Sequence, residues 1–340
     1  MTKKSSRELK YEVIRVVAMI FVIAIHQIDA IAINSKIYYY ISLILLTCNP
    51  MFFMLSGKFA LKFNYEEKGC YKKYYLNKLI KILVPVFIYM IIKEWHVLTF
   101  VFKTEITPYV FIKSLFLSIV EGFSVTEYWF IYTLIANLIA VPFTSRIFRN
   151  LNKNEMKLFF GIGLAYHALI TYLPLVGASF QVPYYLAEFS LYFHLGYCID
   201  SLTETKKEKK WVFILGILSY IISIIQLYLG KTVKIYDIAP TFFFISCMVY
   251  IILRDYVKLD RIKKVILFLG KYSFSIYLLH VMMMDLTGII FPYNGMFMPL
   301  YIIIKIIMIL ISSLVLAIIL DNTIVKWSKN IVSKIIRIQN

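Results

Sequence analysis

Apolar blocks of about twenty residues recur along the chain, and short stretches rich in lysine separate them. A helix needs roughly 20 apolar residues to cross the ~30 Å hydrocarbon core of a bilayer. Hydrophobic residues make up 61% of the chain and charged residues 16%, whereas soluble domains hold roughly 45–50% and 25%. The pattern therefore predicts an all-α polytopic membrane protein.

About ten transmembrane helices are expected. The predicted spans are 10–32, 37–61, 79–98, 128–146, 158–174, 184–200, 211–229, 236–253, 265–287 and 298–325. Segment 99–127 mixes apolar with charged residues, which is typical of an amphipathic or re-entrant segment on the outer side. We expect residues 1–340 to form a single integral-membrane domain, with cytoplasmic tails 1–9 and 326–340.

The basic residues alternate between the two sides of these spans. With the N-terminus in the cytoplasm, most Lys and Arg residues fall in inner segments. The outer segments hold only a few of them: Lys36, Lys93, Lys103, Lys113, Lys231 and Lys234. Cytoplasmic loops carry an excess of Lys and Arg, and an odd number of spans would break the alternation. Both termini are therefore expected in the cytoplasm.

The net charge of +18 does not indicate a nucleic-acid-binding protein. The charges lie between apolar blocks, not on one continuous face with interleaved aromatic residues. The bilayer, and no nucleic acid, is the partner that this pattern predicts. The histidines and cysteines show no metal-ligand spacing such as HExxH or CxxC, so we expect no metal.

The ionisable residues of the first span include Arg15, His26 and Asp29. Arg15 and His26 are eleven residues apart, which places them on one helix face and roughly 16 Å apart along the axis. Arg15 would lie near the inner interface, and His26 deep towards the outer side. Asp29 follows one turn later, where it can orient the imidazole. The alternative is that Arg15 extends to the inner headgroups and His26 bonds to a neighbouring helix.

Five segments in this order resemble the acyltransferase-3 family of integral membrane acyltransferases. They are Arg15-x10-His26, 51–57 (MFFMLSG), 78–85 (KLIKILVP), 128–132 (YWFIY) and 269–280 (LGKYSFSIYLLH). The chain resembles the stand-alone type, without a fused extracytoplasmic domain. It departs from the family pattern at Lys78 and Lys81, where the family often has arginine, and at Lys58, where an aromatic or aliphatic residue is usual.

The resemblance implies an O-acetyltransferase that uses cytoplasmic acetyl-CoA as co-substrate, holds no bound cofactor, and acylates a hydroxyl of a cell-surface glycan or its precursor. His26 would be the catalytic base with Asp29 beside it, and direct transfer and an acyl-histidine intermediate both stay open. The side chains expected to bind the donor phosphates are Arg15, Lys58, Lys78, Lys81 and Lys271. Those expected at the acceptor or cavity are Trp129, Tyr132, Tyr277 and His280. A multi-pass protein of a bacterial plasma membrane is expected.

These residues also have structural interpretations. His280 can be a packed, hydrogen-bonded side chain, Trp129 can belong to an interfacial belt, and His96 and His167 are expected to be structural. Ser56 and Gly57 are expected to allow two helices to approach closely. The alternative function is a transporter or flippase for a glycan or small molecule, although no duplicated halves appear in the sequence. The acceptor, the acyl group and the oligomeric state stay open.

Overall fold

The computed structural model describes residues 8–31, 36–121, 126–178, 189–228, 236–237 and 239–338, and all regular structure within them is helical. Eight described segments are long and apolar enough to cross a membrane. They are Leu9–Asp29, Tyr39–Ala60, Cys70–Val101, Trp129–Asn150, Lys153–Val176, Lys206–Tyr228, Asp260–Ile290 and Met298–Ile336. The all-helical membrane fold is thereby confirmed, while the count of ten spans and the side of each terminus stay predictions. The expected span 184–200 lies partly outside the described residues.

The chain forms two compact units, each built from two separate segments. Unit 1 comprises Met1–Phe63 and Ala140–Gly270, and unit 2 comprises Asn64–Ile139 and Lys271–Asn340. The helices wholly within unit 1 are α1 (Leu9–Ile31), α2 (Lys36–Leu45), α3 (Cys48–Ala60), α8 (Lys153–Tyr172), α9 (Phe189–Leu202), α10 (Lys206–Tyr228) and α11 (Pro240–Ile251). Those wholly within unit 2 are α4 (Cys70–Lys78), α5 (Val84–His96), α6 (Pro108–Glu121), α13 (Met298–Asn322) and α14 (Ile324–Ile338). The chain passes between the units within α7 (Trp129–Asn150) and α12 (Lys263–Ile290).

Three sequence expectations are refined by these bounds. The expected span 37–61 is two helices, because the chain turns at residues 46–47 between α2 and α3. Segment 99–127 contains the 14-residue helix α6, whose residues are half-buried or exposed. Most of the expected tail 326–340 belongs to α14, an amphipathic helix with Lys326, Lys329 and Lys334 along it. Such helices bind at the membrane interface.

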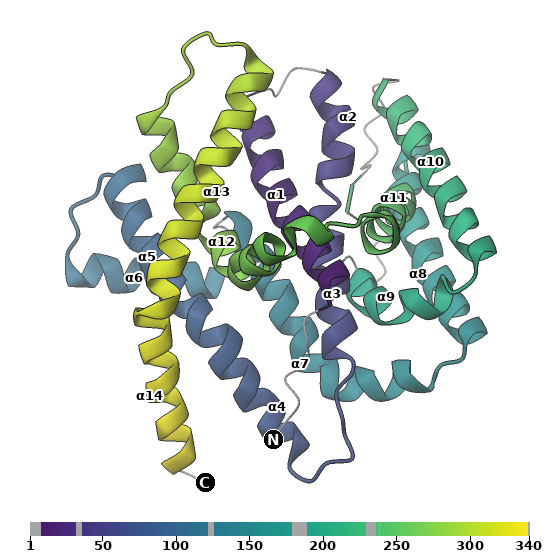
Figure 1. Ribbon diagram of the computed structural model, residues 1–340, viewed down its shortest axis with the longest axis horizontal. Coiled ribbons are helices and arrows are strands. Elements are labelled where there is room, and N and C mark those ends of the chain that lie inside the picture. Colours follow the sequence, from purple (N-terminus) through teal and green to yellow (C-terminus); the bar gives the residue numbers. More distant parts are fainter. Residues whose placement is uncertain are drawn as a thin grey trace. The chain divides into compact units, whose positions relative to one another are not determined.

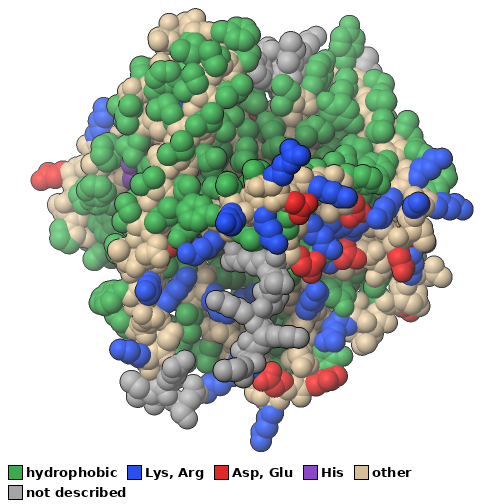
Figure 2. Space-filling model, in the orientation of Figure 1, with side chains coloured by type: hydrophobic (Ala, Val, Ile, Leu, Met, Phe, Trp, Pro, Cys, Tyr) green, Lys and Arg blue, Asp and Glu red, His purple; other side chains and the backbone are tan. Residues whose placement is uncertain are grey.

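The lipid-facing surfaces are apolar, as a membrane requires. Between residues 303 and 319 of α13 the exposed residues recur at every fourth position and are all aliphatic: Ile303, Ile307, Ile311, Val315 and Ile319. Hydrophobic side chains also cover the exposed side of α10, which packs beside α11 in unit 1 (Figures 1 and 2). A soluble helix would carry polar side chains there, so these stripes support the membrane assignment.

Helices α3 and α9 form the closest helix pair of unit 1, and two glycines permit it. A Cβ atom on Gly57 would lie 1.7 Å from the carbonyl oxygen of Phe193, and one on Gly196 would lie 1.8 Å from that of Met54. Small residues let helix backbones approach in membranes, where van der Waals packing drives association. The close approach expected at Gly57 is confirmed. It also fixes the position of Lys58, the next residue on α3.

Replacing Gly57 with alanine is expected to destabilise the protein by about 1–3 kcal/mol or more, because the new methyl group meets rigid backbone. The measurement is thermal unfolding of the purified protein in detergent, together with the yield of monodisperse protein. Gly161→Ala is the matched control, since a Cβ there meets nothing within 4 Å and alanine favours a helix by roughly 1 kcal/mol. Equal unfolding temperatures for both variants would contradict this account of the α3–α9 contact.

Unit 2 is held together by an acid on α13. The Tyr89 hydroxyl on α5 donates to Asp321 Oδ1 at 2.9 Å, and the Ser275 hydroxyl on α12 donates to Oδ2 at 2.7 Å. One carboxylate therefore joins three helices.

A π-helical stretch, Leu79–Leu83, precedes Pro85 and widens the helix there. This is expected where proline cannot donate a backbone hydrogen bond.

Candidate functional site

Helix α1 presents the three predicted residues of the first span. Its hydrophobic side chains are mostly buried, for example Ile14, Ala18 and Val22, whereas Arg15 and His26 are only half-buried. The helix is continuous over the eleven residues between them, so both lie on one face at roughly 16 Å along the axis. The accessible face of α1 therefore carries the arginine towards one end and the histidine towards the other.

Asp29 lies one turn after His26 on α1. Its side chain is exposed, and it interacts electrostatically with the imidazole. Tyr39 and Tyr236 carry electrostatic interactions in the same region of unit 1. A carboxylate next to an imidazole favours the protonated ring and helps to fix its orientation. This arrangement is suited to a histidine that takes up a proton and releases it again.

Arg15 is positioned by an acid on its own helix. Its Nη1 donates to Glu12 Oε1 at 2.7 Å, and the Glu12 side chain is only 5% exposed. The Glu12 carboxylate packs against the backbone of Gly270, where an added Cβ would lie 2.1 Å from Oε2. Gly270 belongs to the late sequence segment 269–280. The glycine thus leaves room for the acid that orients the arginine.

Lys58 belongs to an ion-pair network that sequence patterns did not reveal. Its ammonium group contacts the Asp200 carboxylate and lies 5.0 Å from the centre of the Tyr11 ring. Arg254 Nη1 donates to the other oxygen of Asp200 at 2.6 Å. Lys58 is 6% exposed. The network around Lys58 thus connects α1, α3, α9 and the helical turn after α11. The role of Lys58 in binding the donor stays a prediction.

Asp255, the residue after Arg254, also belongs to this network. Arg254 donates from Nε to Oδ1 at 2.6 Å, and Lys209 lies 2.7 Å from Oδ2. The hydrogen bonds from Arg254, and then that from Lys209, lower the pKa of Asp255 to about 2. The carboxylate is therefore charged at neutral pH and keeps the guanidinium in place.

The remaining donor-binding candidates, Lys78, Lys81 and Lys271, belong to unit 2. Lys78 is half-buried and lies 5.2 Å from the Tyr74 ring centre, while Lys81 is exposed and interacts electrostatically with Lys78. Lys329 on α14 is near enough to Lys81 to interact with it. Lys271 is exposed and donates to the Tyr272 hydroxyl at 2.9 Å. The ammonium groups of Lys78, Lys81 and Lys329 thus interact with one another, and such a group of cations suits phosphate binding.

The four predicted acceptor residues also belong to unit 2. The Tyr277 hydroxyl donates to the Glu127 carbonyl oxygen at 2.6 Å, and His280 Nδ1 lies 2.5 Å from the Tyr277 carbonyl oxygen. Tyr132 is half-buried and donates to the Ile119 carbonyl oxygen at 2.9 Å, and Trp129 is half-buried beside Phe130. His280 is fully buried. His280 is thus packed and hydrogen-bonded, Tyr132 is tied to α6, and the roles of these residues with the acceptor stay predictions.

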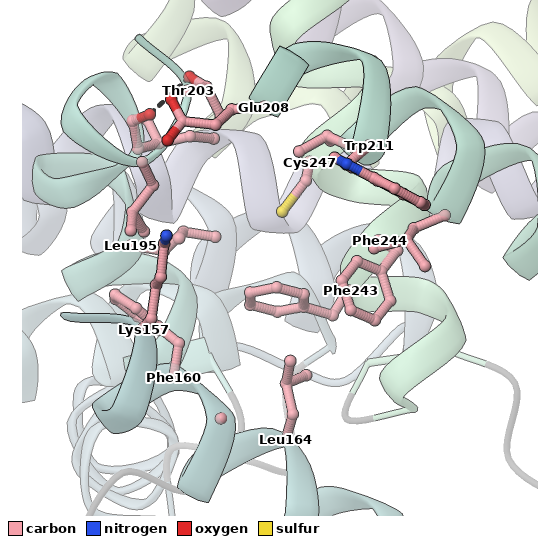
Figure 3. Close-up of a pocket in the computed structure, with 15 residues that line it drawn as sticks. Lys157, Phe160, Leu164, Leu195, Thr203, Glu208, Trp211, Phe243, Phe244 and Cys247 are labelled. Carbon is pink, nitrogen blue, oxygen red and sulfur yellow. Dashed lines mark hydrogen bonds between the residues drawn. The ribbon is translucent and has the colours of Figure 1, made fainter. Parts of the chain in front are cut away.

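A cavity of about 370 Å³ in unit 1 lies among α8, α9, α10 and α11, and its lining is almost wholly apolar. Figure 3 shows the Phe243 ring and the Cys247 sulfur projecting into it, with Trp211, Phe160 and Leu164 around them. None of the predicted site residues lines this cavity. Most of its wall suits a hydrocarbon chain, and the charged residues Lys157 and Glu208 also line it.

No group of three His, Cys, Asp or Glu side chains in the described ranges is arranged to hold a metal ion.

A family model, Acyl_transf_3, described as an acyltransferase domain, matches residues 9–318. The chain belongs to the acyltransferase-3 family. It is therefore a membrane acyltransferase, and the match covers parts of both units and every predicted site residue. No curated protein and no solved structure matches the chain.

Three polar groups of this acyltransferase were not found from the sequence. They are the Lys58–Asp200–Arg254 network, the buried pair Lys93–Glu127 and the pair His96–Asp285. His96 was expected to be structural, and its Nε2 atom lies 3.2 Å from Asp285 Oδ2. The available signal was the position of Lys93, Glu94 and His96 at one end of a span, because ionisable residues at membrane depth are costly and usually functional.

Proposed function

We propose that this membrane acyltransferase transfers an acetyl group from cytoplasmic acetyl-CoA to a hydroxyl group of a cell-surface glycan or its precursor, in a bacterial plasma membrane. The observation that carries the proposal is the accessible face of α1, with Arg15 and His26 both half-buried on one continuous helix. A thioester made inside and an alcohol outside must meet within the membrane. A helix with an anion-binding group near one end and a base near the other fits that task.

The donor end is supported by the distribution of positive charge. Arg15 is held by Glu12, and the planar fork of a guanidinium matches the geometry of a phosphate. Lys78, Lys81 and Lys271 supply ammonium groups in unit 2, where the basic residues of α4 also gather. Cationic segments are typical of the cytoplasmic side, which is where acetyl-CoA is found.

His26 is proposed as the general base. A ring nitrogen accepts the proton of the acceptor hydroxyl while the hydroxyl oxygen bonds to the thioester carbonyl carbon. The tetrahedral intermediate then collapses, the carbon–sulfur bond breaks, and the CoA thiolate leaves and takes the proton from the imidazolium. Asp29 stabilises that imidazolium and is restored unchanged. The sum is an O-acetyl ester and free CoA.

Direct transfer is favoured over an acyl-histidine because Asp29 lies beside His26 and stabilises its protonated form, which is the intermediate of general-base catalysis. An acyl-histidine would instead require the neutral ring to attack the thioester before the acceptor binds. The two routes differ in one observable. Only the acyl-histidine route deposits the acetyl label on the protein in the absence of an acceptor.

The proposal is tested with acetyl-CoA that carries an isotopic label in the acetyl group. Membranes containing the chain are incubated with this donor, and O-acetyl groups on the extracted surface glycans are measured by mass spectrometry. We expect labelled O-acetyl esters that mild alkali removes and that membranes lacking the chain do not form. Free CoA should accumulate in equal amount. Glycans without label, in membranes where the chain is inserted, would contradict the proposal.

A further inference from the structure

Unit 2 contains a second cavity that differs in chemistry from the apolar one in unit 1. Its volume is about 550 Å³, and it lies among the end of α5, helix α6 and the last part of α12. Its polar lining comes from all three segments: Lys93, Glu94 and His96, then Ser114, Ser118 and Glu121, then Asp285. We call this space the acidic cavity. None of the residues predicted from the sequence to act in catalysis or binding lines it.

Glu94 is the most buried acid of the acidic cavity, with 5% of its surface exposed. Its two oxygens accept hydrogen bonds from hydroxyl groups of α6, one from Ser114 and one from Ser118 at 2.8 Å. Hydroxyl donors solvate a carboxylate but do not neutralise it. A desolvated negative charge therefore remains at the wall of the cavity, where electrostatic interactions are stronger than in water.

The cations around the acidic cavity do not balance its acids. Lys93 donates to Glu127 Oε1 at 2.5 Å, so its charge is largely matched by that buried partner. It also interacts electrostatically with Glu94 and Asp285. Asp285 lies 3.2 Å from His96 and is about half exposed, and Glu121 is exposed. Glu94, Glu121 and Asp285 thus give the cavity a net negative charge.

Helix α6 is turned so that its polar side faces this cavity. Ser114, Ser118 and Glu121 recur with helical spacing on the lining side, while Tyr109 and Phe116 are exposed on another side. A soluble helix shows the reverse arrangement. The short helix thus forms a polar wall on the cavity and an apolar surface towards lipid.

The acidic cavity lies at the end of unit 2 that is opposite to the basic segment of α4. Lys81 precedes α5 and His96 ends it, a separation of fifteen residues or roughly 22 Å of helix. Asp285 likewise lies near the C-terminal end of α12. If the lysines of α4 face the cytoplasm, as positive segments do, the cavity opens towards the outer side, where the acceptor arrives.

We propose that the acidic cavity binds the acceptor and selects a sugar unit that donates hydrogen bonds and carries no negative charge. Sugar hydroxyls, or the ammonium group of an amino sugar, would replace the water lost from Glu94 and Asp285. A uronic acid or a phosphorylated sugar would bring a like charge into a site of low dielectric constant and is excluded. The inference deepens the proposed function and rests on it.

The test uses the full chain in lipid nanodiscs and three labelled tetrasaccharide pools of mixed linkage: neutral, amine-bearing and carboxylate-bearing. Equilibrium dialysis without acetyl-CoA measures binding alone, and the neutral and amine-bearing pools are distinguished by their separate affinities. We expect at least one of these two pools to bind about tenfold or more tightly than the carboxylate-bearing pool, the size expected for a hydrogen bond to a charged group. Retention of no pool, or equal retention of all three, overturns the inference.

Glu94→Gln and Asp285→Asn test the residues, because each keeps the shape and removes the charge. Each is expected to raise the acceptor KM about tenfold or more, to leave the acetyl-CoA KM unchanged, and to reduce the discrimination against the carboxylate-bearing pool. Glu105→Gln is the matched control, since Glu105 is an exposed acid outside the cavity, and it should behave as the wild type. A change in the acetyl-CoA KM alone would overturn the assignment.

The two proposals fail in distinguishable ways. Selective binding of a non-anionic pool that Glu94→Gln abolishes, with no acetyl transfer to any glycan, supports the acidic cavity and contradicts the acetyltransferase proposal. Acetyl transfer that neither Glu94→Gln nor Asp285→Asn affects supports the acetyltransferase and contradicts the acidic cavity as the acceptor site.

Discussion

His26→Ala is expected to lower acetyl transfer by about 10²–10⁴-fold, the contribution typical of a general base. The side chain is half-buried on the accessible face of α1, so its removal leaves no large void in the core. His26→Gln, which keeps polarity and much of the volume but cannot become a cation at neutral pH, should be equally inactive. The measurement is initial rate of acetyl ester formation at saturating acetyl-CoA.

His167→Gln is the control for this experiment. His167 is buried in α8 and interacts with the Tyr166 ring. Its replacement tests whether any histidine within a span is needed for activity. We expect transfer within a few-fold of the wild type, with both proteins inserted in equal amount as judged by quantitative immunoblot of washed membranes. Retained turnover in His26→Ala would remove His26 from the mechanism and leave Arg15 without a catalytic partner.

Much of the fold could be predicted because the bilayer imposes one strong pattern, apolar length, on each spanning segment. The expected span 10–32 corresponds closely to α1, and the amphipathic character of 99–127 appears in α6. The same simplicity explains why the sequence did not reveal the break between α2 and α3. A turn between two apolar helices leaves the average hydropathy unchanged.

The candidate site could be predicted only where its residues share one helix. Arg15 and His26 follow from helical geometry, since their relative positions depend on α1 alone. Lys58 and Asp200 are 142 positions apart, and His96 and Asp285 are 189 apart. Periodicity tells which face of a helix a residue occupies but not which distant helix that face meets. The ion pairs of Lys58 and His96 therefore had to come from the structure.

The buried pair Lys93–Glu127 shows why such pairs matter for folding. Lys93 Nζ lies 2.5 Å from Glu127 Oε1, and the two side chains are 9% and 1% exposed. Glu127→Gln leaves an ammonium group in a low-dielectric site without its partner. We expect a loss of about 3–5 kcal/mol in the free energy of unfolding, seen as a lower midpoint of thermal unfolding in detergent. Glu105→Gln, an exposed acid, should have no comparable effect.

The double variant Lys93→Met, Glu127→Gln separates this stability effect from the acidic cavity. It removes both charges together, so most of the lost stability should return, because replacing a buried ion pair by neutral side chains is often tolerated. It also leaves the net charge around Glu94 and Asp285 unchanged, so discrimination against carboxylate-bearing acceptors should persist. In Glu127→Gln alone, Lys93 still interacts electrostatically with Glu94 and Asp285. Its ammonium should then neutralise part of the cavity, and acceptor KM should rise together with the fall in stability. A double variant as unstable as Glu127→Gln would show that the geometry of the pair, and not its charge balance, holds α5 to the start of α7.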